Sequence, residues 1–247
     1  MWLKPAHSLM FPQTKNLSSV TFEFPALLRG EVKALFAWST EWNARRLAMQ
    51  LAVIIVGAGI YGAAMGWWRA PEQALYVAIK FPLIILLTTF GNALINGLLA
   101  PLLGLNIPFR QSFLAVVMSF AITAAILGAF SPLIAFMVWN SPAMAAGPDS
   151  PKPYAMLMLA HVSVIALAGT VGNARMFQLL VQFGQRAAAR RVMFAWLAGN
   201  LFLGSQLSWI LRPFIGSPAL PVEFVRHAAL HGNFYEAVWN SIQQIFP

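Results

Sequence analysis

Residues 77–101 read VAIKFPLIILLTTFGNALINGLLAP, with Lys80 as the only charged residue. A helix needs about 20 apolar residues to cross a bilayer, so this stretch is long enough. In hydrocarbon every backbone N–H and C=O must be bonded within its own segment, which a helix achieves. Four further apolar runs of similar length lie at 47–68, 113–138, 154–173 and 192–211. The sequence therefore predicts an all-α polytopic membrane bundle of about five transmembrane helices.

The composition of the chain agrees with a fold embedded in a bilayer. Of its 247 residues, 59% are hydrophobic and 9% are charged, whereas a soluble domain usually carries about 25% charged residues. The chain contains no cysteine, which excludes disulfides, thiolate metal sites and cysteine nucleophiles. The net charge of +9 lies beside the apolar runs, so anionic lipid head groups, and not nucleic acid, are the expected partners of the basic residues.

Amphipathic segments flank the apolar runs and divide the chain into three parts. Residues 1–46 form a predicted cytoplasmic N-terminal segment, in which 25–46 has apolar residues at helical spacing and is expected to be an amphipathic surface helix. Residues 47–214 form the five-span transmembrane domain. Residues 215–247 form a C-terminal interfacial segment, expected to hold one or two further surface helices. The first 46 residues contain no cleavable signal pattern, so the first span is expected to act as an uncleaved anchor.

The distribution of lysine and arginine predicts the orientation of the chain. Eleven of the 16 basic residues lie on one side of the predicted spans and five on the other. The eleven are Lys4, Lys15, Arg29, Lys33, Arg45, Arg46, Arg110, Arg175, Arg186, Arg190 and Arg191. The positive-inside rule then places the N-terminus in the cytoplasm, next to anionic lipids of that leaflet. An odd number of spans places the C-terminus on the opposite side.

The second and fourth predicted spans share a sequence pattern. TFGNA at 89–93 matches TVGNA at 170–174, and apolar positions around them also match at the same offset. This pattern favours a duplication of a two-helix hairpin, 77–138 and 154–211, with the first span added. Parallel repeats of this kind occur in some transporters. The alternative is a chance similarity between two apolar helices.

Several polar side chains fall inside the predicted spans, where such residues usually face the protein interior and pair with one another. The candidates for a buried polar cluster or pathway are Asn92, Asn96, His161, Asn173, Asn200 and Gln206. One interpretation is hydrogen bonding between helices, at about 0.6 kcal/mol per contact on average. The alternative is a polar pathway or pocket, in which His161 would relay protons or serve as an axial ligand to haem or a chlorophyll-type pigment.

Four further residues have predicted structural or interfacial roles. Lys80 and Arg212 lie near the outer ends of their spans, from which long basic side chains usually snorkel to the interface. Gly62 and Gly66 continue a ladder of small residues at four-residue spacing that begins at Ala58. Such a ladder predicts that two helix backbones approach each other closely.

The spans carry no recognisable catalytic arrangement. They contain no aspartate or glutamate, the usual carrier in ion-coupled transporters and proton pumps. The chain has no Walker motif, no dinucleotide fingerprint and no histidine–carboxylate cluster. His227 and His231 are four residues apart, but two histidines without a third ligand make a weak metal motif. The sequence therefore favours a non-catalytic protein without a metal site.

The C-terminal third contains SWILRPFIGSP at 208–218 and GNFYEAV at 232–238. These motifs resemble a family of uncharacterised bacterial polytopic membrane proteins. The five-span layout with a cytoplasmic N-terminus also loosely resembles Yip1-type proteins, in layout only. The resemblance implies a bacterial inner membrane, in which the orientation predicted from the basic residues places the C-terminus in the periplasm. It supplies no activity and no site residue.

These observations lead to one functional hypothesis and two alternatives. The first is a non-catalytic scaffold or accessory subunit of an inner-membrane complex, which binds protein partners or a second copy through small-residue faces and surface helices. The second is a small transporter or channel with a pathway lined by asparagine and histidine. The third is a subunit that binds a cofactor or pigment through His161.

Overall fold

The computed structural model describes residues 29, 31–142, 151–216 and 221–245 of the chain. Within these ranges all regular structure is helical, which confirms the predicted all-α class. The helices are α2 (Val32–Thr40), α3 (Ala44–Gly66), α4 (Pro71–Leu102), α5 (Phe109–Asn140), α6 (Pro151–Phe183), α7 (Arg186–Ile210) and α8 (Phe234–Ile245). The long helices α3 to α7 form the body of the molecule.

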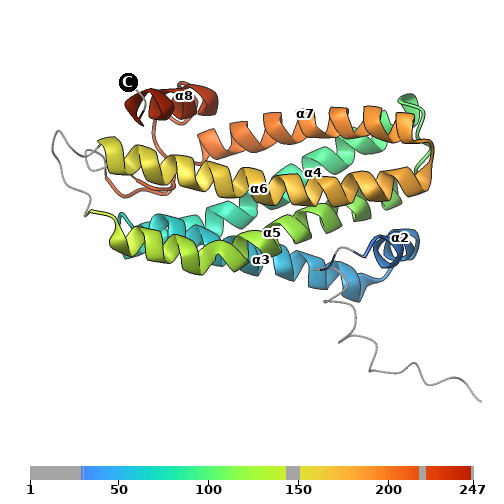
Figure 1. Ribbon diagram of the computed structural model, residues 1–247, viewed down its shortest axis with the longest axis horizontal. Helices are drawn as coiled ribbons and strands as arrows, with labels where there is room; N and C mark the ends of the chain where they lie inside the picture. Colours follow the sequence, from blue (N-terminus) through green and yellow to red (C-terminus); the bar gives the residue numbers. More distant parts are fainter. Residues whose placement is uncertain (1–28, 30, 143–150, 217–220, 246–247) are drawn as a thin grey trace, which may run out of the picture.

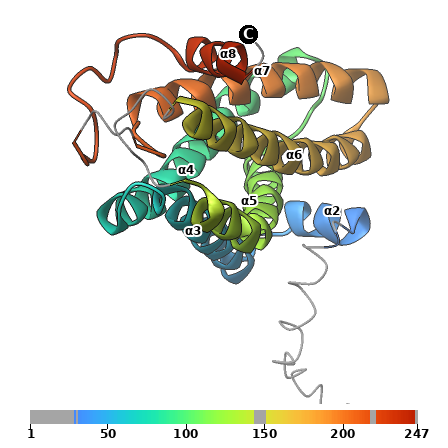
Figure 2. The same cartoon turned by 60° about the vertical axis from the view of Figure 1, so that its left-hand side comes forward.

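Consecutive helices from α3 to α7 run in opposite directions and form a bundle (Figure 1). Helix α3 packs against α4 and α5, α6 packs against α5 and α7, and α7 packs against α4. Helix α2 lies at one end, where the rings of Phe36 and Phe183 have centroids 5.0 Å apart. Helix α8 lies at the other end, where Ser241 contacts Met158 near the start of α6. Figure 2 shows from a second angle that α2 and α8 lie far apart.

Four of the described helices, α3 to α6, are long and apolar enough to cross a membrane. Helix α7, at the place of the fifth predicted span, has 25 residues. At 1.5 Å per residue this length is about 38 Å, which exceeds the roughly 30 Å of a hydrocarbon core. Helix α7 is more polar than the others because arginines occupy its first turns and Asn200 and Gln206 its second half. The chain is thus a multi-pass membrane protein, roughly in agreement with the predicted five spans.

A capping residue divides the helix that the sequence predicts at 25–46. The side-chain oxygen of Asn43 accepts hydrogen bonds from the backbone N–H groups of Arg45 (3.0 Å) and Arg46 (3.2 Å), and α3 begins there. Asparagine is among the residues preferred at a helix N-cap. The prediction of a single helix is therefore wrong, because α2 ends before this cap and α3 follows as a separate element. The first residues of the predicted helix lie outside the described ranges.

Glycines allow α3 to approach α4 closely. A Cβ atom added at Gly62 would lie 2.6 Å from the carbonyl oxygen of Val77, and one added at Gly66 would lie 2.6 Å from that of Gln73. Both glycines are buried. The predicted small-residue ladder therefore lies inside the monomer, at the contact between α3 and α4. This face is therefore not available to hold a partner.

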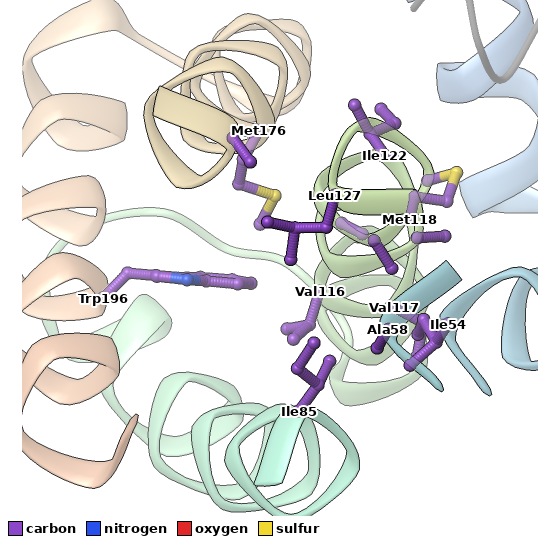
Figure 3. Packing of buried hydrophobic residues seen from close by; sticks show 14 of the residues in the cluster. Ile54, Ala58, Ile85, Val116, Val117, Met118, Ile122, Leu127, Met176 and Trp196 are labelled. Carbon is purple, nitrogen blue, oxygen red and sulfur yellow. The ribbon is translucent and has the colours of Figure 1, made fainter. Parts of the chain in front are cut away.

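Large apolar side chains fill the space between the helices. Figure 3 shows Trp196 of α7 pointing into the centre of the bundle toward Leu127 of α5, and Met176 of α6 and Ile85 of α4 point into the same core. All four side chains are buried. Outward positions are also apolar, with Leu98 74% exposed. An exposed surface of this kind is suited to contact with lipid tails.

Candidate functional site

The asparagines predicted inside the membrane bond to their own helices and to each other. Asn92 Nδ2 donates to the carbonyl oxygen of Thr88 at 3.0 Å and to Oδ1 of Asn200 in α7. Asn96 and Asn173 each donate to the carbonyl oxygen four residues earlier, at 2.9 and 2.8 Å. The contact between Asn92 and Asn200 therefore joins α4 to α7, as polar side chains do between transmembrane helices.

The six predicted polar residues are not gathered at one place. The two asparagines of α4 are buried, whereas Asn173, Asn200 and Gln206 are half-buried. His161 lines the cavity described below, and the other five residues do not. Sequence spacing places residues on a helix face, but it does not show which neighbouring helix that face contacts.

His161 of α6 is held by a tyrosine that the sequence analysis did not identify. Its Nδ1 lies 3.1 Å from the hydroxyl oxygen of Tyr61 in α3, and the two rings meet edge to face. His161 is 3% exposed and Tyr61 is fully buried. A tyrosine hydroxyl that donates to Nδ1 leaves the proton of a neutral imidazole on Nε2. Among the described residues Nε2 has no hydrogen-bond partner.

After α7 the chain folds back over the end of the bundle as an irregular segment that we call the strap (211–216 and 221–233). Lys80 of α4 holds the strap in place. Its Nζ donates to the carbonyl oxygens of Pro213 at 2.7 Å and Phe224 at 2.6 Å. The same Nζ lies 5.1 Å from the ring centre of Phe224, which adds a cation–π contact.

The predicted snorkelling of Lys80 to the interface is wrong. The residue is fully buried, and carbonyl oxygens and aromatic rings replace the water that would solvate its charge. Gln73, two turns earlier on α4, strengthens the same contact because its Nε2 donates to the carbonyl oxygen of Pro213 at 2.7 Å. Two side chains of α4 therefore bind one short part of the strap.

Arg212 fixes the strap from the C-terminal end of α7. Its guanidinium lies 3.8 Å from the ring centre of Trp209 and donates to four backbone carbonyl oxygens at 2.6 to 3.0 Å. These carbonyls belong to Trp209, Ala228, Ala229 and His231. Burial, followed by the positive charge of Arg226, lowers the pKa of Arg212. Arg212 therefore organises the chain end and does not simply extend into the interface, as the sequence had suggested.

A cavity of about 130 Å³ lies beside the strap, between α6, α7 and α8. Much of its wall is apolar. The apolar side chains include Met65, Phe81, Met158, Val162, Ile165 and Phe214. The polar groups include His161, Ser208, Arg212 and Arg226. An engineered apolar cavity of roughly 150 Å³ binds benzene, so this cavity has room for a small chemical group.

The polar side of the cavity is positively charged. Arg226 comes from the strap, where its backbone N–H donates to the carbonyl oxygen of Arg212 at 3.3 Å. The Nε atom of Arg226 is buried without a hydrogen-bond partner in the described part of the chain. Lys80 lies near enough for Arg226 and Glu223 to act on its charge. Arg226 and Arg212 therefore line the cavity, with Lys80 and Glu223 nearby and Glu236 of α8 beside Gly232 and Trp209.

The fit of a metal or a cofactor can be judged from these residues. Within the described ranges, no three His, Asp or Glu side chains gather to hold a metal ion. The cavity beside His161, at about 130 Å³, is well below the roughly 300–1,000 Å³ of typical cofactor sites.

Comparisons with known protein families, with curated proteins and with solved structures find no match. The candidate site is therefore supported by its geometry alone. Sequence analysis identified His161, Lys80 and Arg212, but it did not find Tyr61 or Arg226. The local sequence around those two residues gives no signal, because each acquires its neighbours only when distant helices pack.

Proposed function

We propose that this chain is a non-catalytic scaffold or accessory subunit of a bacterial inner-membrane complex, with its N-terminus in the cytoplasm. Its buried polar groups support this function because they bond helices and the strap to one another. The asparagines line neither the cavity beside His161 nor the concave surface between α2 and α6. A transporter would need such groups along a path that water can enter.

The observation that carries the proposal is an open face of small residues on α6. Ser163, Ala166, Thr170 and Ala174 are exposed at helical spacing, and a Cβ atom added at Gly169 would meet no atom within 4 Å. In Figure 1, α6 lies at the front of the bundle, and none of the other described helices crosses in front of it. Small residues allow a second transmembrane helix to approach closely. A helix of a partner subunit, or of a second copy, fits this face.

Substituting Ala166 or Gly169 with leucine is expected to weaken the complex at least about tenfold, because the new side chain separates the two helix backbones. The measurement is native mass spectrometry of the protein extracted from its own membrane in mild detergent. The wild-type protein should retain a stoichiometric partner or second copy, which the variants lose. Ala198→Leu is the matched control, since Ala198 is exposed on α7, away from this face.

Two results would contradict the proposal. One is a wild-type protein that leaves the membrane as a lone monomer. The other is a partner that stays bound equally well in Ala166→Leu, Gly169→Leu and Ala198→Leu. The masses of the bound subunits also separate a second copy of the chain from a different protein.

A further inference from the structure

Two residues that line the cavity beside the strap have side-chain nitrogens without hydrogen-bond partners, and that of His161 is a donor when Tyr61 donates to Nδ1. His161 Nε2 and Arg226 Nε are both buried and lack a hydrogen-bond partner among the described residues, and both residues line the cavity. A buried donor left unpaired costs about 1–3 kcal/mol, and more when it is charged. A ligand that brings acceptor oxygens to this cavity would remove that cost.

The charge of the cavity selects the kind of acceptor. The guanidinium of Arg212 already donates hydrogen bonds to four carbonyl oxygens of the chain. Its positive charge still acts on the site together with that of Arg226. An anionic oxygen forms stronger hydrogen bonds with such donors than a neutral one does. The preferred ligand group is therefore an oxyanion such as a phosphate ester.

The apolar wall and the position of the cavity select what the oxyanion is attached to. Met158, Val162 and Ile165 of α6 form part of the wall, and Val162 and Ile165 are half-exposed on the surface of the bundle. Trp209, which also lines the cavity, is of the residue type enriched at the level of lipid head groups. A ligand with a charged head and an apolar chain satisfies both sides of the cavity.

We infer that this cavity is a binding site for the head group of an anionic phospholipid, with Arg226 and His161 as donors to the phosphate and the α6 wall against the start of an acyl chain. The site lies at the α8 end of the bundle, opposite the end where the basic residues predict contact with anionic lipids. Its α6 wall adjoins the small-residue face, since Ile165 lies one turn before Gly169. Lipid binding is measured without a partner subunit, so the inference does not depend on the proposed scaffold function.

The test is lipid binding by the full chain, measured by native mass spectrometry in detergent with added phosphatidylglycerol or phosphatidylcholine of the same acyl chains. Two variants probe the two halves of the site: Arg226→Gln removes the charge, and Ile165→Trp fills the apolar side. Their matched controls are Arg190→Gln at the opposite end and Ile60→Trp on the outer side of α3, both at exposed positions. Glycerol phosphate serves as the head group without chains.

Phosphatidylglycerol is expected to bind at least about tenfold more tightly than phosphatidylcholine. Arg226→Gln should remove this preference. Ile165→Trp should weaken the binding of phosphatidylglycerol at least about tenfold. The two control variants should bind both lipids like the wild type. Equal binding of the two lipids, or an unchanged preference in both site variants, would overturn the inference. Competition by glycerol phosphate at the concentration of the lipid would assign the site to a soluble phosphate ester and would also overturn it.

Discussion

Gly62→Leu is expected to lower the free energy of unfolding by about 3 kcal/mol, the upper part of the usual range for overpacking a core. A Cβ atom at Gly62 would lie 2.6 Å from the carbonyl oxygen of Val77 and 3.0 Å from Cβ of Phe81. The backbone oxygen cannot move aside unless α3 and α4 separate. Denaturant unfolding in mixed micelles, followed by tryptophan fluorescence, measures the change.

Gly169→Leu is the matched control for this prediction. The substitution is the same, but no atom lies within 4 Å of the added Cβ. Its effect on unfolding should stay within about 0.5 kcal/mol, although it is expected to weaken the complex. Equal stability of the Gly62 and Gly169 variants would show that α3 and α4 are not packed as closely as described.

Lys80→Met is expected to release the strap from α4. Methionine keeps most of the side-chain volume but removes the ammonium that bonds to the carbonyl oxygens of Pro213 and Phe224. Hydrogen bonds that involve a charged donor contribute about 1.5–3 kcal/mol each. A loss of about 3 kcal/mol would raise the rate of tryptic cleavage after Arg226 roughly 100-fold, if cleavage follows the population of the open strap.

Limited proteolysis with mass spectrometry of the fragments measures this release. Lys33→Met serves as the control, because Lys33 is exposed on α2 at the other end of the bundle. The control should be cut after Arg226 at the wild-type rate. A strap that remains protected in Lys80→Met would mean that apolar packing, and not the buried lysine, holds it.

The long helices were predictable because their signal is local. An apolar run of about 20 residues must be helical in hydrocarbon, whatever surrounds it. The contacts at the end of the bundle could not be predicted, because they join residues that are far apart in the sequence. Lys80 and Pro213 are 133 residues apart, and Tyr61 and His161 are 100 residues apart, so no pattern along the chain links either pair.

The polar residues show a second limit. Sequence spacing correctly places Asn92 and Asn96 within one helix, but a membrane helix is apolar on most sides, so apolar periodicity does not reveal which neighbour it faces.

Asn43 is a different case, because a local signal was present. An asparagine directly before Ala44 and two arginines is a typical helix start, and it marks the break that the predicted helix at 25–46 lacks.

Five crossings would place α2 and α8 on opposite sides of the membrane, and cysteine labelling measures this directly. The chain contains no cysteine, so Lys33→Cys in α2 and Glu236→Cys in α8 each introduce a single exposed thiol. In intact cells a membrane-impermeant maleimide should label Glu236→Cys, and it should label Lys33→Cys only after permeabilisation. Labelling of both positions from the same side would mean that α7 does not cross and would contradict the five-span bundle.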